Sequence, residues 1–158
     1  MHGKSLSGPT IDALSSTEAS AIAGKKAIGY YREKGIAMLH DGWAASGRYL
    51  DLTLLADWLR ARIDEALVQM VATYDTIPFN AVGESLVYRA IAGVLALAEQ
   101  AGVIAPQGSD DGGWTVTVPK SSAISSVDRA GRRYPGARYS CRALGSMHTL
   151  DIAGSMGV

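Results

Sequence analysis

The side chains that could do chemistry are few and widely spaced along the chain. Its three histidines are His2, His40 and His148, and no two of them stand at a spacing typical of metal ligands. His148 alternates with Leu150 and Ile152, so we expect it to pack against or cap a strand. The histidines therefore predict no metal centre.

Cys141 is the single cysteine, which excludes an internal disulfide framework and fits assembly in a reducing compartment. It alternates with Tyr139 and Ala143 on one face of an expected strand, with Arg138 and Arg142 on the other face. A reactive thiol needs an electropositive and partly exposed site. We expect instead a buried and inert thiol.

The acidic residues likewise form no catalytic or metal-binding group. Asp110 and Asp111 lie in a glycine-rich loop, but the calcium-loop spacing and its closing glutamate are missing. Asp64 and Glu65 are neighbours on an expected helix, so their carboxylates diverge around its axis. The sequence contains no phosphate-binding, dinucleotide-binding or nucleophile-elbow motif. We therefore expect neither enzyme activity nor a cofactor.

The overall composition restricts the partners and the number of domains. Lys and Arg total 15, as do Asp and Glu, so the chain lacks the cationic excess of a general nucleic-acid binder. No signal peptide is recognisable, and charged residues interrupt the apolar stretches, so we expect no membrane insertion. A length of 158 residues suits one domain, with residues 1–14 as an extended lead-in.

The elements that would position these side chains begin with a short helix and two strands. Ser15 and Glu18 have the spacing of a capping box, which predicts a helix from there to about residue 26. Residues 27–33 and 36–40 are expected as strands, with Asp41-Gly42 as a turn signal.

Two long helices follow. The first is predicted over residues 51–73 with Asp51 as its N-cap, and Ile77-Pro78 interrupts the chain after it. The second is expected from about Asn80 to Ala101, with Gly102 as a left-handed C-cap. The apolar positions that recur in the first helix at spacings of three and four are Leu55, Trp58, Leu59, Ile63, Leu67, Met70 and Val71.

The last third of the chain reads as short strands around one short helix. Strands are expected over residues 114–118, 137–143 and 147–153, and a helix over 126–133 capped by Ser125 or Ser126. The predicted fold class is α+β, with two long helices packed on one face of an antiparallel or mixed β-sheet.

Two features suggest contacts with other proteins. The first is an arginine-rich stretch without acids, which is either a solvated face or a cationic patch for an acidic partner; its members are Arg129, Arg132, Arg133, Arg138 and Arg142. The second is the strand-like end of the chain, where only Asp151 is charged after Arg142. Such a strand either closes the domain's own sheet or pairs with another subunit.

Taken together, the segments resemble the C-terminal region of the phage contractile-tail sheath family. The resemblance covers about residues 15–158 and depends on the order of short landmarks. They are Tyr30-Tyr31, Asp41-Gly42, Tyr49-Leu50-Asp51, Asp57-Trp58-Leu59, Ile77-Pro78, Gly83, Gly102-Val103-Ile104-Ala105, Val116-Thr117-Val118-Pro119, Asp128-Arg129-Ala130, Arg132 and His148 with Ile152-Ala153-Gly154 and Val158.

This resemblance implies a structural subunit that assembles helically around a tail tube and contracts to drive the tube into a cell. It implies a single sheath core-like domain, located in the virion tail and assembled in the host cytoplasm, with C-terminal strands available for pairing between subunits. The candidate pairing residues are Leu150, Ile152, Met156, Val158, Ala27 and Tyr30, and the arginine-rich stretch or the exposed side of a long helix is the candidate tube contact.

The implied partners are further copies of the chain, the tail tube protein, the baseplate and the tail terminator. Family members usually carry a substantial N-terminal region that this chain lacks, so the chain is either a fragment of the core or a naturally short relative. A short relative would be a tail adapter, terminator or baseplate-associated ring protein of the same particle. A third alternative is a small α+β enzyme with an unrecognised site.

Overall fold

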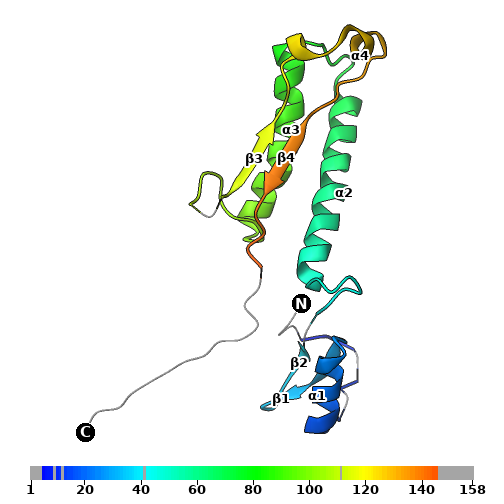
Figure 1. Cartoon of the computed structure of the whole chain (residues 1–158), viewed down its shortest axis with the longest axis vertical. Coiled ribbons are helices and arrows are strands. Elements are labelled where there is room, and N and C mark those ends of the chain that lie inside the picture. Colours follow the sequence, from blue (N-terminus) through cyan, green and yellow to red (C-terminus); the bar gives the residue numbers. More distant parts are fainter. Residues whose placement is uncertain (1–4, 9, 12, 41, 111, 146–158) are drawn as a thin grey trace, which may run out of the picture. The chain divides into compact units, whose positions relative to one another are not determined.

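The computed structural model describes residues 5–8, 10–11, 13–40, 42–110 and 112–145 (Figure 1). The chain forms two compact units, one of Met1–Leu54 with Gly145–Val158 and the other of Leu55–Leu144. Helices and strands are both present, which confirms the α+β class. The described strands form two separate two-stranded antiparallel sheets in place of the single sheet that we expected.

The first unit begins with helix α1 (Ser16–Gly24). The predicted capping box is confirmed, because Ser15 Oγ accepts from the Glu18 amide at 3.3 Å and Glu18 accepts from the Ser15 amide at 2.9 Å. The helix is two residues shorter than predicted. It ends at a left-handed Lys26 (φ 56°), after which the Ala27 amide donates to the Ile22 carbonyl at 3.2 Å.

A β-hairpin of strands β1 (Gly29–Glu33) and β2 (Ile36–His40) completes the described elements of this unit. β1 starts two residues later than predicted, because the Ala27 amide is used in the turn that ends α1. The register pairs Glu33 with Ile36 and leaves a two-residue turn of Lys34 and Gly35. Both turn residues have positive φ (48° and 85°), as a tight hairpin turn requires.

The second unit is built on helix α2 (Leu50–Thr73), whose first five residues are assigned to the first unit, and on helix α3 (Ala81–Gln100). The two helices run antiparallel (Figure 1). The expectation that Asp51 is the N-cap of α2 is wrong. The helix starts at Leu50, and Asp51 lies in its first turn, where its carboxylate accepts from the Leu52 amide at 2.9 Å. An acid at this position still interacts favourably with the helix dipole.

Both ends of α3 follow the prediction. Asn80 is the N-cap, and its side-chain oxygen accepts from the Val82 amide at 2.9 Å and the Gly83 amide at 3.3 Å. Gly102 has φ 68° and its amide donates to Glu99, while the Val103 amide donates to Ala98. These two bonds form a Schellman motif, the helix ending that favours glycine at its left-handed residue.

The rest of the second unit is a small sheet with two short helical segments. Strands β3 (Trp114–Thr117) and β4 (Arg138–Cys141) pair antiparallel, with Trp114 opposite Cys141. Between them lie the 3-10 helix η1 (Ser121–Ala123) and helix α4 (Ser126–Ala130). α4 is three residues shorter than predicted, and its N-cap is Ser125, one of the two residues that we expected.

The core of this unit lies between α2, α3 and β3. Its buried side chains are Leu59, Ile63, Ile91, Val94, Leu95, Ala98, Ile104 and Trp114. Two of the apolar positions predicted to face the core, Trp58 and Val71, are exposed instead. Trp58 lies about 100° around the helix axis from Leu59 and Val71 about 120°, so one face does not include all three.

Helix α3 is long and apolar enough to cross a membrane, by length and composition alone. Core helices of soluble proteins pass the same test, so one such helix is weak evidence for a span. The buried residues of α3 include Ile91, Val94 and Leu95, which pack in the core described above. Two of its acids, Glu84 and Glu99, accept hydrogen bonds from Ser121 and Trp114.

Candidate assembly interface

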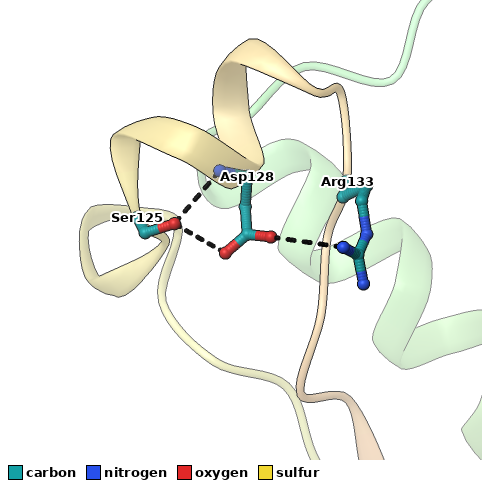
Figure 2. A network of polar contacts seen from close by, with 3 residues as sticks. All are labelled: Ser125, Asp128 and Arg133. Carbon is teal, nitrogen blue, oxygen red and sulfur yellow. Dashed lines mark hydrogen bonds and ion pairs between the residues drawn. The ribbon is translucent and has the colours of Figure 1, made fainter.

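The arginine-rich stretch starts on α4, which is held in place by its own polar network (Figure 2). Ser125 Oγ accepts from the Asp128 amide at 3.0 Å and lies 2.6 Å from the Asp128 carboxylate. The other oxygen of that carboxylate is 4.0 Å from an Arg133 nitrogen. The charge of Arg133 is therefore partly balanced by an acid immediately before the stretch.

Arg129 is used inside the unit. Its guanidinium donates to the Ser121 carbonyl and, at 3.4 Å, to the Ile124 carbonyl. It also lies over the ring of Phe79, with 5.9 Å between the guanidinium carbon and the ring centroid. These contacts attach α4 to η1 and to the segment between α2 and α3, so Arg129 has a structural role.

Arg132 differs from both neighbours. It ends α4 as the left-handed residue of a Schellman motif, with φ 53° and with the Arg133 amide donating to the Asp128 carbonyl at 2.8 Å. Its side chain is exposed. Within the described ranges, no hydrogen bond or ion pair involves the Arg132 guanidinium. Its charge is therefore available to a partner.

The last two arginines lie on or next to β4. Arg138 is the first residue of that strand and pairs with Thr117, and its side chain is exposed. The Arg142 backbone accepts from the Ala105 amide at 2.8 Å and donates to the Gly113 carbonyl at 3.1 Å. The five arginines thus come from a helix, the turn after it, a strand and the residue that follows the strand, and Arg129 already has a structural role.

A cavity of about 240 Å³, which we call the turn cavity, lies beside Arg132. Its lining includes Met70, Ile77, Pro78, Phe79, Val87 and Arg132. A more open hollow of about 690 Å³ shares several of these residues and adds Tyr74, Asp75 and Arg129. The sequence analysis did not predict this cavity, although Ile77-Pro78-Phe79 is the apolar segment between the two predicted helices.

Hydrogen bonds of Tyr134 and Glu84 hold the wall of the turn cavity that contains Tyr134. The Tyr134 hydroxyl donates to the Pro119 carbonyl, and its ring lies 5.8 Å from that of Phe79. Burial raises the pKa of Tyr134, and the nearby Glu84 charge raises it further. The Glu84 carboxylate accepts from the Ser121 amide at 2.5 Å, and this bond lowers its pKa. The wall formed by residues 119–134 is thus tied to α3.

The residues predicted to pair between subunits fall into two groups. Leu150, Ile152, Met156 and Val158 lie outside the described residues. Ala27 is exposed and precedes β1, whereas Tyr30 lies within β1 opposite Leu39. The Tyr30 hydroxyl also bonds to the backbone of Leu6, donating to its carbonyl at 3.1 Å and accepting from its amide at 3.2 Å.

The residues considered for chemistry show no catalytic arrangement in the described part of the chain. Cys141 is half-buried against the core of the second unit, and burial raises the pKa of its thiol, which disfavours the reactive thiolate. His40 is buried, stacks on Tyr31 with 3.7 Å between ring centroids, and lies 3.4 Å from Glu33. Among the described residues, no group of three or more His, Cys, Asp or Glu could hold a metal ion.

Solved structures share this fold. The anti-feeding prophage baseplate contains a chain that matches 91% of this chain with a TM-score of 0.66 and 16% identity. The helical sheath of the same prophage, in its contracted state, matches 98% with a TM-score of 0.67 and 14% identity. The chain spans 40% and 44% of the length of those two proteins. The fold is therefore that of a segment of contractile-particle proteins.

The sequence comparison is more specific. Residues 50–156 match the model of the E217 tail sheath protein gp31-like C-terminal domain, and the chain belongs to this family. No curated protein matches it. The family is one of structural tail sheath proteins, which confirms the resemblance drawn from the ordered landmarks. The match includes α2, α3, the arginine-rich stretch and the turn cavity.

Proposed function

We propose that this chain is a structural subunit of a contractile tail sheath, which assembles helically around the tail tube and drives its penetration on contraction. The observation that supports this most directly is the sheath-domain match over residues 50–156. The similarity of 98% of the chain to a contracted sheath protein supports it as well. The subunit would be located in the virion tail and assembled in the host cytoplasm.

The proposed links between subunits are strands added to open sheet edges. Both described sheets have only two strands, so each strand leaves one edge unpaired among the described residues. Two-stranded sheets are marginal by themselves, and a third strand would satisfy the free backbone groups along an edge. We assign the donated strand to the segment containing Leu150, Ile152, Met156 and Val158, with the region of Ala27 and Tyr30 as the second linking segment.

The proposed tube contact involves the arginine-rich stretch. Arg132 and Arg138 have exposed side chains and lie on either side of Tyr134 in the sequence. Arginine suits such a surface because its guanidinium pairs with carboxylates in a bidentate manner. This role predicts binding to the tube that weakens as the salt concentration rises.

The experiment is electron microscopy of the purified chain, alone and mixed with the tail tube protein of the same particle. A variant that ends at Thr149 is the comparison. We expect helical tubes or sleeves around the tube protein, and we expect truncation to abolish them. A chain that stays monomeric in both mixtures and is unaffected by truncation would overturn the proposal.

A second function is favoured by a specific observation. The anti-feeding prophage baseplate protein matches the chain almost as well as the sheath protein does, with TM-scores of 0.66 and 0.67. A baseplate-associated, adapter or terminator protein of the same particle would form closed rings of fixed copy number rather than extended helices. The same micrographs distinguish the two functions by particle shape.

A further inference from the structure

The turn cavity combines an apolar hollow with one cation, Arg132, whose side chain has no polar partner among the described residues. Ile77, Pro78, Phe79 and Val87 contribute the apolar lining, and Arg132 lies at the same hollow. Asp75 lines only the wider hollow, and none of the ion pairs between described residues joins it to an arginine. The site therefore fits a ligand that presents an apolar side chain beside a carboxylate.

The end of α4 holds an exposed charged side chain at a position where glycine is usual. The left-handed residue of a Schellman motif is normally glycine, and Gly102 has that position at the end of α3. The Arg132 amide donates to the Arg129 carbonyl at 3.0 Å within this motif, but no described hydrogen bond or ion pair involves its guanidinium. The exposed guanidinium can therefore contact another molecule.

The matching ligand is present on the chain itself, at the tip of the β1–β2 hairpin. Ile36 is 63% exposed, although it is a large apolar residue. The register places Ile36 directly opposite Glu33, so both side chains lie on the same face of the hairpin. The tight turn of Lys34 and Gly35 holds the two strands together at this end.

Glu33 can make a second contact while it keeps its first. One carboxylate oxygen lies 3.4 Å from His40 Nδ1, and the Glu33 side chain is 56% exposed. A carboxylate has about four acceptor positions, so it can also accept from a guanidinium. The hairpin tip thus presents an apolar side chain and a carboxylate, and the turn cavity presents the complementary apolar hollow and guanidinium.

We infer that the turn cavity binds the hairpin tip of a second copy of this chain, with Ile36 in the hollow and Glu33 paired with Arg132. The two surfaces are different, so the contact is heterologous and repeats from copy to copy. This inference rests on the proposed function, because a repeating head-to-tail contact is what a helical sheath needs. It adds a contact that uses no donated strand, and it leaves Arg138, the other exposed arginine named for the tube contact, to the tube.

Two variants test the two sides of the contact. Arg132→Gly removes the guanidinium and relieves the left-handed strain, so the variant should unfold at the same temperature or higher. Ile36→Lys puts a positive charge near Arg132 and beside Glu33, where it can pair across the strands and preserve the hairpin. Val127→Lys is the control, since Val127 is 79% exposed on the nearby α4 and does not line the turn cavity.

Sedimentation velocity of the full chain measures the association. We expect the average mass of the wild-type chain and of Val127→Lys to rise with concentration. Each test variant should raise the dissociation constant about tenfold or more, as removal of a central contact does. Equal amounts of Arg132→Gly and Ile36→Lys should form dimers that do not grow further, because only one intact hairpin and one intact cavity can meet.

Each other outcome has a definite meaning. A wild-type chain that stays monomeric, or test variants that associate like the control, would overturn the contact. A mixture of the two variants without dimers would also overturn it, since the hairpin would then bind elsewhere or within its own chain. If the variants lose head-to-tail dimers while tubes still form in micrographs, the sheath function stands without this contact. If the contact forms but wild-type tubes and tube binding are absent, the contact stands and the sheath function does not.

Discussion

Gly83 is the residue at which one added methyl group should disturb the fold most. It is the third residue of α3 and is buried where the helix approaches the Ile77-Pro78 turn. A Cβ at this position would lie 2.0 Å from the Pro78 carbonyl oxygen and 3.2 Å from its carbon. Both are backbone atoms, so no side-chain rotation relieves the clash.

The size of the effect follows from what must move. Relieving an overpacked contact costs about 1–3 kcal/mol, and displacing the Pro78 turn strains the adjacent Asn80 cap, which is worth about 1 kcal/mol. Alanine in place of glycine regains up to about 1 kcal/mol of helix propensity. We therefore expect Gly83→Ala to lower the free energy of unfolding by about 1–3 kcal/mol. For a chain of this size the melting temperature should fall by about 2–12 °C.

Gly93→Ala is the matched control on the same helix. Gly93 is exposed, and nothing lies within 4 Å of a Cβ built on it. The same substitution there should raise the free energy of unfolding by about 0.5–1 kcal/mol. Circular dichroism during thermal and urea unfolding measures both variants. If Gly83→Ala were as stable as Gly93→Ala, the close approach of α3 to Pro78 would be wrong, and with it this wall of the turn cavity.

Two further predictions concern the acids of α3. The indole nitrogen of the buried Trp114 donates to the Glu99 carboxylate at 2.5 Å. Glu99→Ala removes this acceptor and should lower the free energy of unfolding, measured in urea, by about 1–3 kcal/mol. Glu99→Gln keeps an acceptor and should cost less, and equal losses would contradict the role of this bond. The bond from the Ser121 amide lowers the pKa of Glu84 below its ordinary value of 4.5, so the group stabilises the fold above pH 4.5, and this stabilisation is lost as the pH falls through the lowered pKa. The melting-temperature difference between wild type and Glu84→Gln should therefore be largest near pH 7 and vanish well below pH 4.5, and a difference independent of pH would refute this.

The long helices and their ends were predictable because their signals are local. Asn80 caps α3 by accepting hydrogen bonds from the first amides of that helix, and Gly102 ends α3 in a left-handed conformation. The exceptions are residues that occupy positions where another type is usual. Lys26 and Arg132 are left-handed at helix ends that glycine would favour, so the pattern predicted helices that run too far.

The sheets were less predictable, because strand pairing depends on residues distant in sequence. Trp114 pairs with Cys141 across the segment that contains η1 and α4, whereas Gly29 pairs with His40 through a two-residue turn. The alternation of apolar and polar residues in these strands does not indicate that β1–β2 and β3–β4 belong to separate units. The α+β class was therefore predictable, but the division into two sheets was not.

The candidate interface was predictable in composition but not in detail. The run of arginines is visible in the sequence. Only the structure shows that Arg129 donates to the Ser121 carbonyl and lies over the Phe79 ring, and that Arg133 is close to Asp128. The turn cavity was missed for a similar reason. Its lining comes from the end of α2, the following turn, α3 and the Tyr134 region, which only the fold brings together.

Helix α2 shows why apolar spacing alone does not identify the residues of the core. Leu59 and Ile63 face the core, but Val68 and Val71 are 69% and 61% exposed and Trp58 is exposed as well. Trp58 lies about 140° around the helix axis from Val71, so the exposed residues do not form one apolar face. Val71 also lines the turn cavity, where the contact that we infer would cover it. Spacings of three and four therefore grouped residues that no single helix face contains, and only the structure shows that Leu59 and Ile63 face the core.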